Sequence, residues 1–165
     1  MPPISAQSAD AVESILQKYG NLLFRICLVM LKDPDDAEDA VQDTLLQYLQ
    51  KAPVFDSSEH EKAWLIRVAS NKCRDHLRFC FHHRHCPLSE VQTQVFNPED
   101  SAILEALMTI PEKFRIVMVL YYVEEYRIAE IADIIHKSDS AVKMRLQKGR
   151  RLLEEVYRRE YLEYD

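Results

Sequence analysis

Glycine is almost missing from this chain of 165 residues, in which it occurs only twice. Such scarcity favours helices throughout and leaves no glycine loop of the kind that cradles a nucleotide phosphate. The chain also has no alternating apolar and polar run that would indicate a strand. Hydrophobic residues make up 47% of the sequence, which is sufficient for a core and excludes wholesale disorder. We therefore expect an all-α fold.

Long apolar runs, a secretion signal and catalytic motifs are missing as well. The longest apolar stretch, near Ile26 to Leu31, is too short to cross a bilayer. Residues 1–5 lack the cationic start and the apolar run of a signal peptide. No nucleophile motif and no pair of histidines at metal spacing on a helix occurs. The sequence predicts a cytoplasmic protein that is not an enzyme, needs no cofactor and does not insert into membranes.

The most informative segment spans residues 126–151, which has the pattern of two short helices joined by a polar turn. Ile128, Ile131, Ala132 and Ile135 follow a helical period, and Val142 and Leu146 begin a second apolar face after the turn. The hydroxyl and carboxyl groups of residues 138–140 are suited to cap the second helix. This pattern predicts a helix-turn-helix, whose second helix enters the DNA major groove.

The charge of this segment supports DNA binding although the charge of the whole chain does not. Residues 137–151 contain six Lys or Arg and one Asp, whereas the chain has a formal net charge of −6. Affinity for nucleic acid depends on the charge of the contacting face, so a cationic helix can bind DNA even within an acidic protein. The alternative is an ordinary solvated helix face.

The chain is predicted to form two small helical domains, residues 1–79 and 99–165, joined by a flexible linker at residues 80–98. The linker has no sustained helical period and contains two prolines. Three helical patterns precede it and three or four follow it. The first has the apolar face Val12, Ile15, Leu16, Tyr19, Leu22, Leu23 and Ile26.

The second and third helical patterns carry opposite charges. In the second, Asp35 is expected to cap the helix, and the predicted buried positions are Ala37, Ala40, Val41, Thr44, Leu45, Tyr48 and Leu49. Its other face is acidic, with six carboxylates and no Lys or Arg in residues 33–43. Capping needs fewer, so we expect a surface for a basic partner. The third helix, from Glu61 to about Phe79, is basic, and its Trp64 is either a core anchor or a platform for base stacking.

Four motifs in order give the chain a recognisable family resemblance. They are residues 36–46 (DAEDAVQDTLL), 62–78 (KAWLIRVASNKCRDHLR), 110–115 with 121–132 (IPEKFR and YYVEEYRIAEIA), and 140–153 (SAVKMRLQKGRRLL). Together they resemble a bacterial RNA polymerase sigma factor of the extracytoplasmic-function (ECF) group of the sigma-70 family, over about residues 12–153. The resemblance implies a transcription initiation factor that binds core RNA polymerase, reads the −35 and −10 promoter elements and aids strand opening.

The resemblance also implies which residues do this work. Core polymerase would be bound by Asp36, Glu38, Asp39, Gln42 and Asp43. The −10 element would be held by Trp64, Arg67, Asn71, Lys72, Arg74 and Arg78. The −35 element would be faced by Ser140, Lys143, Met144, Arg145, Lys148 and Arg151. Lys143 and Arg145 are the expected base-edge contacts, with Lys148 and Arg151 on phosphates. The loop at about residues 55–61 would hold a flipped base, and an anti-sigma factor would be a further partner.

Three features leave alternatives open. His136 stands where the family usually has glycine in the turn, which requires either a left-handed residue or a different turn. Glu125 also occupies a position where glycine is frequent. The linker contains a cluster of metal-ligand types, Cys80, His82, His83, His85 and Cys86, although its spacing matches no structural zinc pattern. The competing function is a stand-alone helix-turn-helix regulator, responsive to metal or redox state through this cluster.

Overall fold

The computed structural model describes residues 6–83 and 101–159, and in these two ranges it contains helices and no strand. The chain divides into two compact units, residues 1–90 and residues 91–165. The division is consistent with two helical domains joined by a linker, as the sequence predicts. The exact domain limits remain a prediction. Within the described ranges no helix is long and apolar enough to span a membrane.

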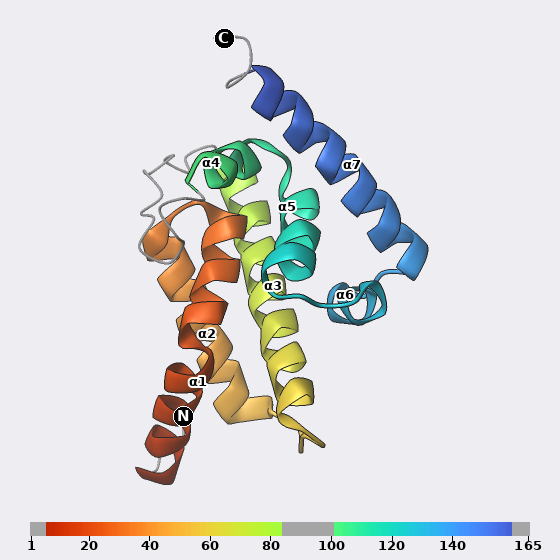
Figure 1. Ribbon diagram of the computed structural model, residues 1–165. Coiled ribbons are helices and arrows are strands. Elements are labelled where there is room, and N and C mark those ends of the chain that lie inside the picture. The colour runs from red at the N-terminus through yellow and green to blue at the C-terminus, as the bar shows by residue number, and fades with distance from the viewer. Residues whose placement is uncertain (1–5, 84–100, 160–165) are drawn as a thin grey trace. The chain divides into compact units, whose positions relative to one another are not determined.

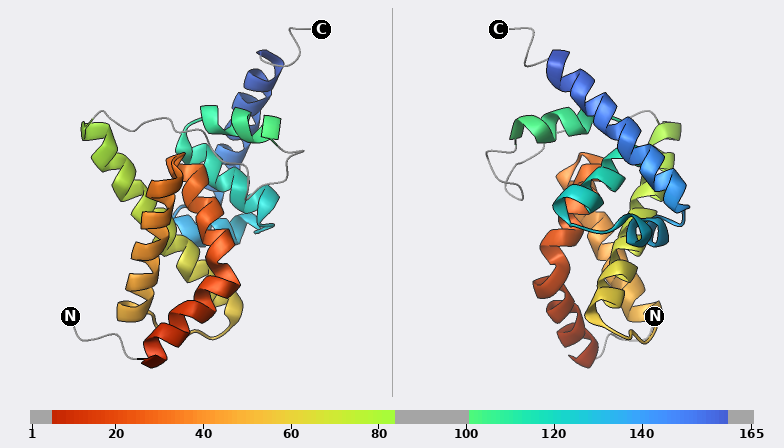
Figure 2. Two further views of the ribbon diagram at one scale, coloured as in Figure 1. Left: turned by 90° about the vertical axis from the view of Figure 1, so that its left-hand side faces the viewer. Right: turned by 45° about the vertical axis from the view of Figure 1, so that its right-hand side comes forward.

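The first unit consists of three long helices: α1 (Ala6–Leu31), α2 (Pro34–Lys51) and α3 (Ser58–His83). All three pack against one another (Figures 1 and 2). Residues from each helix fill the core, among them Leu23, Ile26 and Leu65, which are fully buried. Burying one such side chain contributes about 1.5–3 kcal/mol to folding. This packing fixes the outward faces of α2 and α3, which carry the charges.

Several local predictions for this unit need correction. Leu16 does not belong to the buried face of α1, because 44% of it is exposed. The cap of α2 is Asp33 rather than Asp35: its carboxylate accepts hydrogen bonds from the backbone N–H groups of Asp35 and Asp36. Pro34 occupies the first helical position, where the missing N–H has no cost. Tyr48 and Leu49 are half-buried, whereas the other five residues predicted to be buried on α2 are buried.

Helix α3 is longer at both ends than the sequence indicates. It begins at Ser58, where the Ser57 hydroxyl accepts a hydrogen bond from the His60 N–H, and it continues to His83. The first four residues of the predicted linker are therefore helical. The metal-ligand cluster begins inside this helix, with Cys80, His82 and His83, while His85 and Cys86 lie outside the described residues.

The second unit contains α4 (Ser101–Thr109), α5 (Glu112–Met118), the π-helical turn η3 (Val119–Val123), α6 (Ile128–Ile135) and α7 (Asp139–Tyr157). Helix α7 packs against α4, α5 and α6 (Figures 1 and 2). The core of this unit includes Ile116, Leu120, Ile131, Ile134 and Leu146, which are almost fully buried. Helix α7 is thereby held on one side and leaves its other side exposed.

Candidate functional site

The turn between α6 and α7 confirms the helix-turn-helix and decides between the two alternatives for His136. His136 is left-handed, with φ 55° and ψ 49°, and the N–H of Lys137 donates to the carbonyl of Ala132 at 3.0 Å. Ser138 then caps α7, because its hydroxyl accepts a hydrogen bond from the Ala141 N–H at 3.1 Å. Histidine therefore adopts the conformation that glycine provides most easily.

Buried residues on α7 determine which of its side chains face outward. Val142, Leu146 and Gly149 point into the unit. Opposite them lie Ser140, Met144, Gln147 and Arg151, at spacings of four, three and four residues, and all four are exposed. We call these four residues the recognition face. Gln147 was not singled out from the sequence, although the helical period through Ser140 and Met144 points to it.

Cations flank the recognition face on both sides. Lys143 and Lys148 are exposed, whereas Arg145 is half-buried and lies nearer the core. The Lys148 ammonium is 5.6 Å from the ring centroid of Phe114 on α5. Arg150 lies away from the face, and its guanidinium donates to the Tyr122 hydroxyl at 2.9 Å. All six residues predicted for the −35 element therefore lie on one helix, with Arg145 the least accessible.

The acidic surface of α2 is largely exposed. Asp35, Glu38, Asp39, Gln42 and Asp43 are exposed, and we call them the acidic face. Asp36 differs, because its carboxylate is 3.1 Å from Nε2 of His76 on α3, and both side chains are about one-third exposed or less. Asp36 thus links α2 to α3, whereas the side chains of the acidic face are exposed to solvent. Asp35, which the sequence suggested as a cap, is available to this face instead.

The outward side of α3 is basic. Trp64, Arg67, Asn71, Arg74 and Arg78 recur at intervals of three or four residues and so share one side of the helix. Asn71 and Arg78 are exposed, and Trp64, Arg67 and Arg74 are half-buried. Arg78 forms an exposed ion pair with Asp75 at 3.5 Å. Lys72, also predicted for the −10 element, is half-buried and lies off this line.

Three aromatic rings secure the segment between α2 and α3. Tyr48 stacks on Phe55, with centroids 6.1 Å apart and planes 12° apart, and Trp64 meets both rings edge-on. The structure thus supports the core-anchor interpretation of Trp64, although the ring remains half-exposed. Phe55 is held, whereas its neighbour Val54 is 93% exposed. The loop predicted at about residues 55–61 to hold a flipped base is anchored at Phe55, but its second half, residues 58–61, is the first turn of α3 rather than loop.

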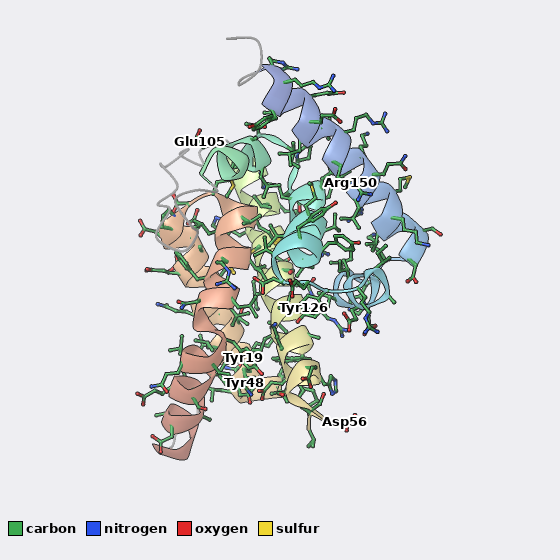
Figure 3. All side chains as sticks on the ribbon, in the orientation of Figure 1. Tyr19, Tyr48, Asp56, Glu105, Tyr126 and Arg150 are labelled. Carbon is green, nitrogen blue, oxygen red and sulfur yellow. The ribbon has the colours of Figure 1, made fainter. Side chains whose placement is uncertain are left out.

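Two tyrosines connect α1 and α2 to the start of α3, and both are labelled in Figure 3. The Tyr48 hydroxyl donates to Glu61 at 2.9 Å, and the Tyr19 hydroxyl donates to the Ser58 carbonyl at 3.2 Å. Burial raises the pKa of Tyr48 to about 12, and the hydrogen bond to Glu61 adds to the shift because it favours the protonated phenol. These bonds fix the helix that carries the basic residues.

Arg115 has a structural role that its sequence position does not reveal. It is only 3% exposed, and its guanidinium donates to the carbonyls of Met108 and Ile110 at 3.2 and 3.1 Å. Burial lowers its pKa to about 10, and the carboxylate of Glu112 partly opposes that shift. The charge thus satisfies the carbonyls at the end of α4 and connects this helix to α5.

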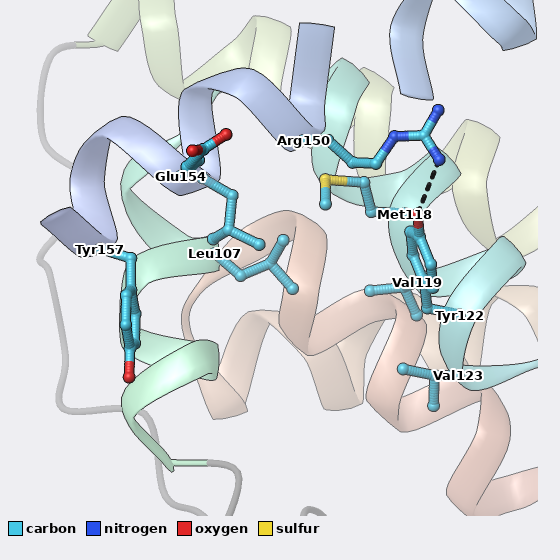
Figure 4. A pocket seen from close by; sticks show the side chains of 9 residues that line it. Leu107, Met118, Val119, Tyr122, Val123, Arg150, Glu154 and Tyr157 are labelled. Carbon is cyan, nitrogen blue, oxygen red and sulfur yellow. Dashed lines mark hydrogen bonds between the residues drawn. The ribbon is translucent and has the colours of Figure 1, made fainter. Parts of the chain in front are cut away.

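An apolar pocket of about 530 Å³ opens beside η3 and the last turns of α7 (Figure 4). Its lining includes Leu107, Val119, Val123 and Leu153, together with the hydrogen-bonded pair Arg150 and Tyr122. The π-helical turn leaves Tyr122 and Val123 half-exposed at this place. The sequence alone does not reveal this pocket, because residues from α4, α5, η3 and α7 line it together.

Metal chemistry has no support in the part of the chain that the structure describes. No group of three or more potential metal ligands occurs there. Cys27 and Cys73 are buried in the first unit. The predicted cluster from Cys80 to Cys86 falls on residues whose side chains are not described, so the metal or redox alternative stays a prediction.

Two family models match the chain, each within one of its units. The model described as "Sigma-70 region 2" matches residues 15–79, and the model described as "Sigma-70, region 4" matches residues 100–153. The first match ends within α3, and the second contains the helix-turn-helix. Together they cover most of the sequence.

Curated proteins and solved structures give similar matches. The ECF RNA polymerase sigma factors SigW and SigM of Bacillus subtilis are 26% and 29% identical to this chain. Each alignment covers 90% of this chain, together with 90% of SigW and 96% of SigM.

Among solved structures, the sigma factor RpoE of Bartonella quintana, crystallised with the anti-sigma factor NepR, has a TM-score of 0.75 at 20% identity. That match covers 90% of this chain and 97% of RpoE. CnrH, in complex with the cytosolic domain of CnrY, has a TM-score of 0.68 at 24% identity. That match covers 94% of this chain and 95% of CnrH. The two structures show a shared fold.

Proposed function

The chain belongs to the ECF group of the sigma-70 family of RNA polymerase sigma factors, and we propose how its surfaces divide that family's work. As a member, it is a transcription initiation factor that binds core RNA polymerase and directs it to promoters. It catalyses no reaction itself and acts in the cytoplasm, where the polymerase is. In our proposal the acidic face of α2 binds the polymerase, and α3 and α7 bind DNA.

The acidic face is suited to a basic protein partner. Glu38, Asp39 and Asp43 project from α2 without a cation beside them on that helix before Lys51. Exposed charges steer association and increase its rate, and they distinguish partners by sign. Asp36, held by His76, is expected to position α2 rather than to lead the contact. Core polymerase is the basic partner that we assign to this face.

The basic side of α3 and the adjoining loop are assigned to the −10 element. Asn71 and Arg78 are accessible to a DNA strand, and Trp64 presents part of its ring for stacking. The aromatic contacts of Phe55 hold the loop at residues 52–57 beside this side of α3. A loop held in this way is ready to receive an extruded base without first becoming ordered.

The recognition face of α7 is assigned to the −35 element. A helix lying in the major groove places its central side chains on base edges and its flanking cations on phosphates. Met144 and Gln147 are central and exposed, and Lys143, Lys148 and Arg151 surround them. Arg145 is expected to contact a base edge by extending from the flank of the helix.

One observation carries this proposal: one chain exposes an acidic helix and a cationic recognition helix on two separate units. A stand-alone helix-turn-helix regulator needs only the second of these surfaces. It would bind its operator tightly without polymerase, whereas the proposed factor binds free promoter DNA weakly. An anti-sigma factor that covers either charged surface is a further partner that we propose.

Run-off transcription with core polymerase and genomic DNA tests the proposal. Addition of the protein is expected to produce new transcripts with defined start sites. Asp39→Arg should weaken core binding at least tenfold in a pull-down titration, because it reverses a charge at the centre of the acidic face. Asp10→Arg is the matched control, since Asp10 is exposed on α1 and outside that face. No new transcripts, together with unchanged core binding by Asp39→Arg, would refute the assignment.

A further inference from the structure

We propose that the apolar pocket beside η3 binds a small amphipathic carboxylate, whose charged group is held by Arg150 and Tyr122. The ligand class is a medium-chain fatty acid or a molecule of the same build, with one carboxylate on an apolar body. This site goes beyond the proposed function, because its lining includes no residue of the acidic face or of the recognition face.

The first step is the size and composition of the pocket. Its volume of about 530 Å³ lies within the range of roughly 300–1,000 Å³ that is usual for small-molecule sites. Leu107 of α4, Val119 of η3 and Leu153 of α7 contribute apolar side chains to it (Figure 4). All its lining residues belong to the second unit, so the packing of that unit forms the site.

The second step is the gathering of exposed apolar side chains at this pocket. Tyr122 is 50% exposed, Val123 49% and Tyr157 41%, and all three line it. Single exposed hydrophobic residues are common on protein surfaces, whereas several of them at one concave place indicate a binding site. A bound apolar chain leaves the water as well, and each buried CH₂ group tightens its binding about fourfold.

The third step is a fixed pair of hydrogen-bond donors. The Arg150 guanidinium donates to the Tyr122 hydroxyl at 2.9 Å, as Figure 4 shows. The Tyr122 ring is itself held edge-on against Tyr121, with centroids 4.9 Å apart. A guanidinium has five N–H donors, and a phenol that accepts one hydrogen bond still has its own O–H to donate. The pair therefore offers several donors to the two oxygens of a carboxylate.

The fourth step is the charge at the pocket. Of the described residues that line it, Arg150 and Glu154 are charged, and the Glu154 carboxylate is already paired with Arg158 at 2.7 Å. Among residues 6–83 and 101–159, no carboxylate lies within ion-pair distance of the Arg150 guanidinium. One cation without a carboxylate partner suits a ligand with a single negative charge. The nearby Glu154 disfavours a doubly charged phosphate.

The test is isothermal titration calorimetry of the full chain with sodium decanoate below its micellar concentration. We expect one decanoate to bind per chain, with octanoate about 15-fold weaker and dodecanoate about 15-fold tighter. Decan-1-ol has the same chain without the charge and should bind about tenfold more weakly or worse. Because a ligand that binds only the folded state stabilises it, decanoate should also raise the thermal midpoint in proportion to the logarithm of its concentration.

Two variants separate the roles of the donors. Arg150→Met removes the cation and keeps an apolar side chain, so it should weaken decanoate binding about tenfold or more and leave decan-1-ol binding unchanged. Tyr122→Phe keeps the ring and removes the hydroxyl, which should weaken decanoate binding about three- to tenfold. Arg159→Met is the matched control and should bind decanoate as wild type does, because Arg159 is exposed and does not line the pocket.

The same measurements can overturn the proposal. Equal affinities for decanoate and decan-1-ol, or full decanoate affinity in Arg150→Met, would remove the carboxylate from this site. Several decanoate molecules bound per chain, with no effect of Arg150→Met, would show nonspecific adsorption instead. Absence of decanoate binding would also refute the proposal. Loss of core-polymerase binding by Val123→Asp in a pull-down would then assign the pocket to a protein partner.

Discussion

At the residue scale, the turn of the helix-turn-helix depends on the backbone of His136. A left-handed conformation costs a non-glycine residue roughly 1–2 kcal/mol, and only glycine adopts it without steric cost. His136 nevertheless has φ 55°, because the turn must bring α7 back across α6. The protein thus stores strain at the point that sets the angle of its recognition helix.

We predict that His136→Gly stabilises the second unit by up to about 1 kcal/mol, since relief of strain exceeds the entropy that glycine adds to the unfolded chain. His136→Val should destabilise it, because a β-branched side chain tolerates this conformation least. Urea unfolding of both variants measures the change. A lower midpoint for His136→Gly than for wild type would show that the histidine side chain makes a favourable contact that outweighs the strain.

Tyr48 is the residue whose ionisation should be visible in stability. Its pKa is raised from about 10 to about 12 by burial and by Glu61, so the folded state retains the proton longer than the unfolded state. The resulting stabilisation is fully present below about pH 10 and is lost as the pH rises through about 12.

Tyr48→Phe should lower stability at neutral pH by about 1 kcal/mol, the usual value of a hydrogen bond. The difference between wild type and variant is expected to shrink between about pH 10 and about pH 12, because only wild type has this group to deprotonate. Urea midpoints measured across that range provide the comparison. A constant difference would mean that Tyr48 titrates alike in both states.

At the element scale, the two glycines of the sequence have opposite roles, although both lie within helices. At Gly20 in α1, an added Cβ would meet only Leu16 at 3.6 Å, which is an ordinary contact. At Gly149 in α7, it would meet Met118 and Phe114 inside the core. The helical pattern alone does not distinguish these positions. Packing against α5 does.

Gly20→Ala should therefore stabilise α1 by up to about 1 kcal/mol through helix propensity. Gly149→Ala has the same gain in helix propensity, but the added methyl group overpacks the contact between α5 and α7, which costs about 1–3 kcal/mol. We therefore expect Gly149→Ala to lower the free energy of unfolding. Thermal unfolding combined with hydrogen exchange of α1 and α7 assigns each effect to its unit. Equal stabilisation by both substitutions would mean that Met118 moves aside without cost.

At the scale of the whole molecule, the separate units predict separable functions. Arg145→Ala should leave the affinity for core polymerase unchanged, because the acidic face is in the other unit. It should relax discrimination at one base pair of the −35 element by about 1–3 kcal/mol, as expected for a lost base-edge contact. Promoter fragments with single substitutions, bound by holoenzyme, test this. Uniform weakening on all fragments would place Arg145 on the phosphate backbone instead.

Much of the architecture could be predicted from the sequence because it depends on local patterns. Helical periodicity located the helix-turn-helix, the acidic helix and the basic helix. The structure confirms the predicted burial of residues such as Val142 and Ala40. The prediction named Asp35 as the cap of α2, whereas Asp33 is the cap. Both residues flank Pro34, and a carboxylate suits either position. The prediction that Leu16 belongs to the buried face of α1 was also wrong, because a helical period identifies the centre of an apolar face but not where that face ends.

The sequence by itself determined the fold class and the sign of charge on each helix, because these follow from residue types at fixed spacing along one element. Its four motifs indicated the family through their resemblance to sigma factors. Tertiary structure decided what depends on neighbours from other elements. It turned Asp36 toward His76, buried Arg115 under the end of α4, and gathered Lys113 and Lys148 around Phe114. Distances between side chains on different helices depend on how closely the helices pack, and no pattern within a single helix contains that information.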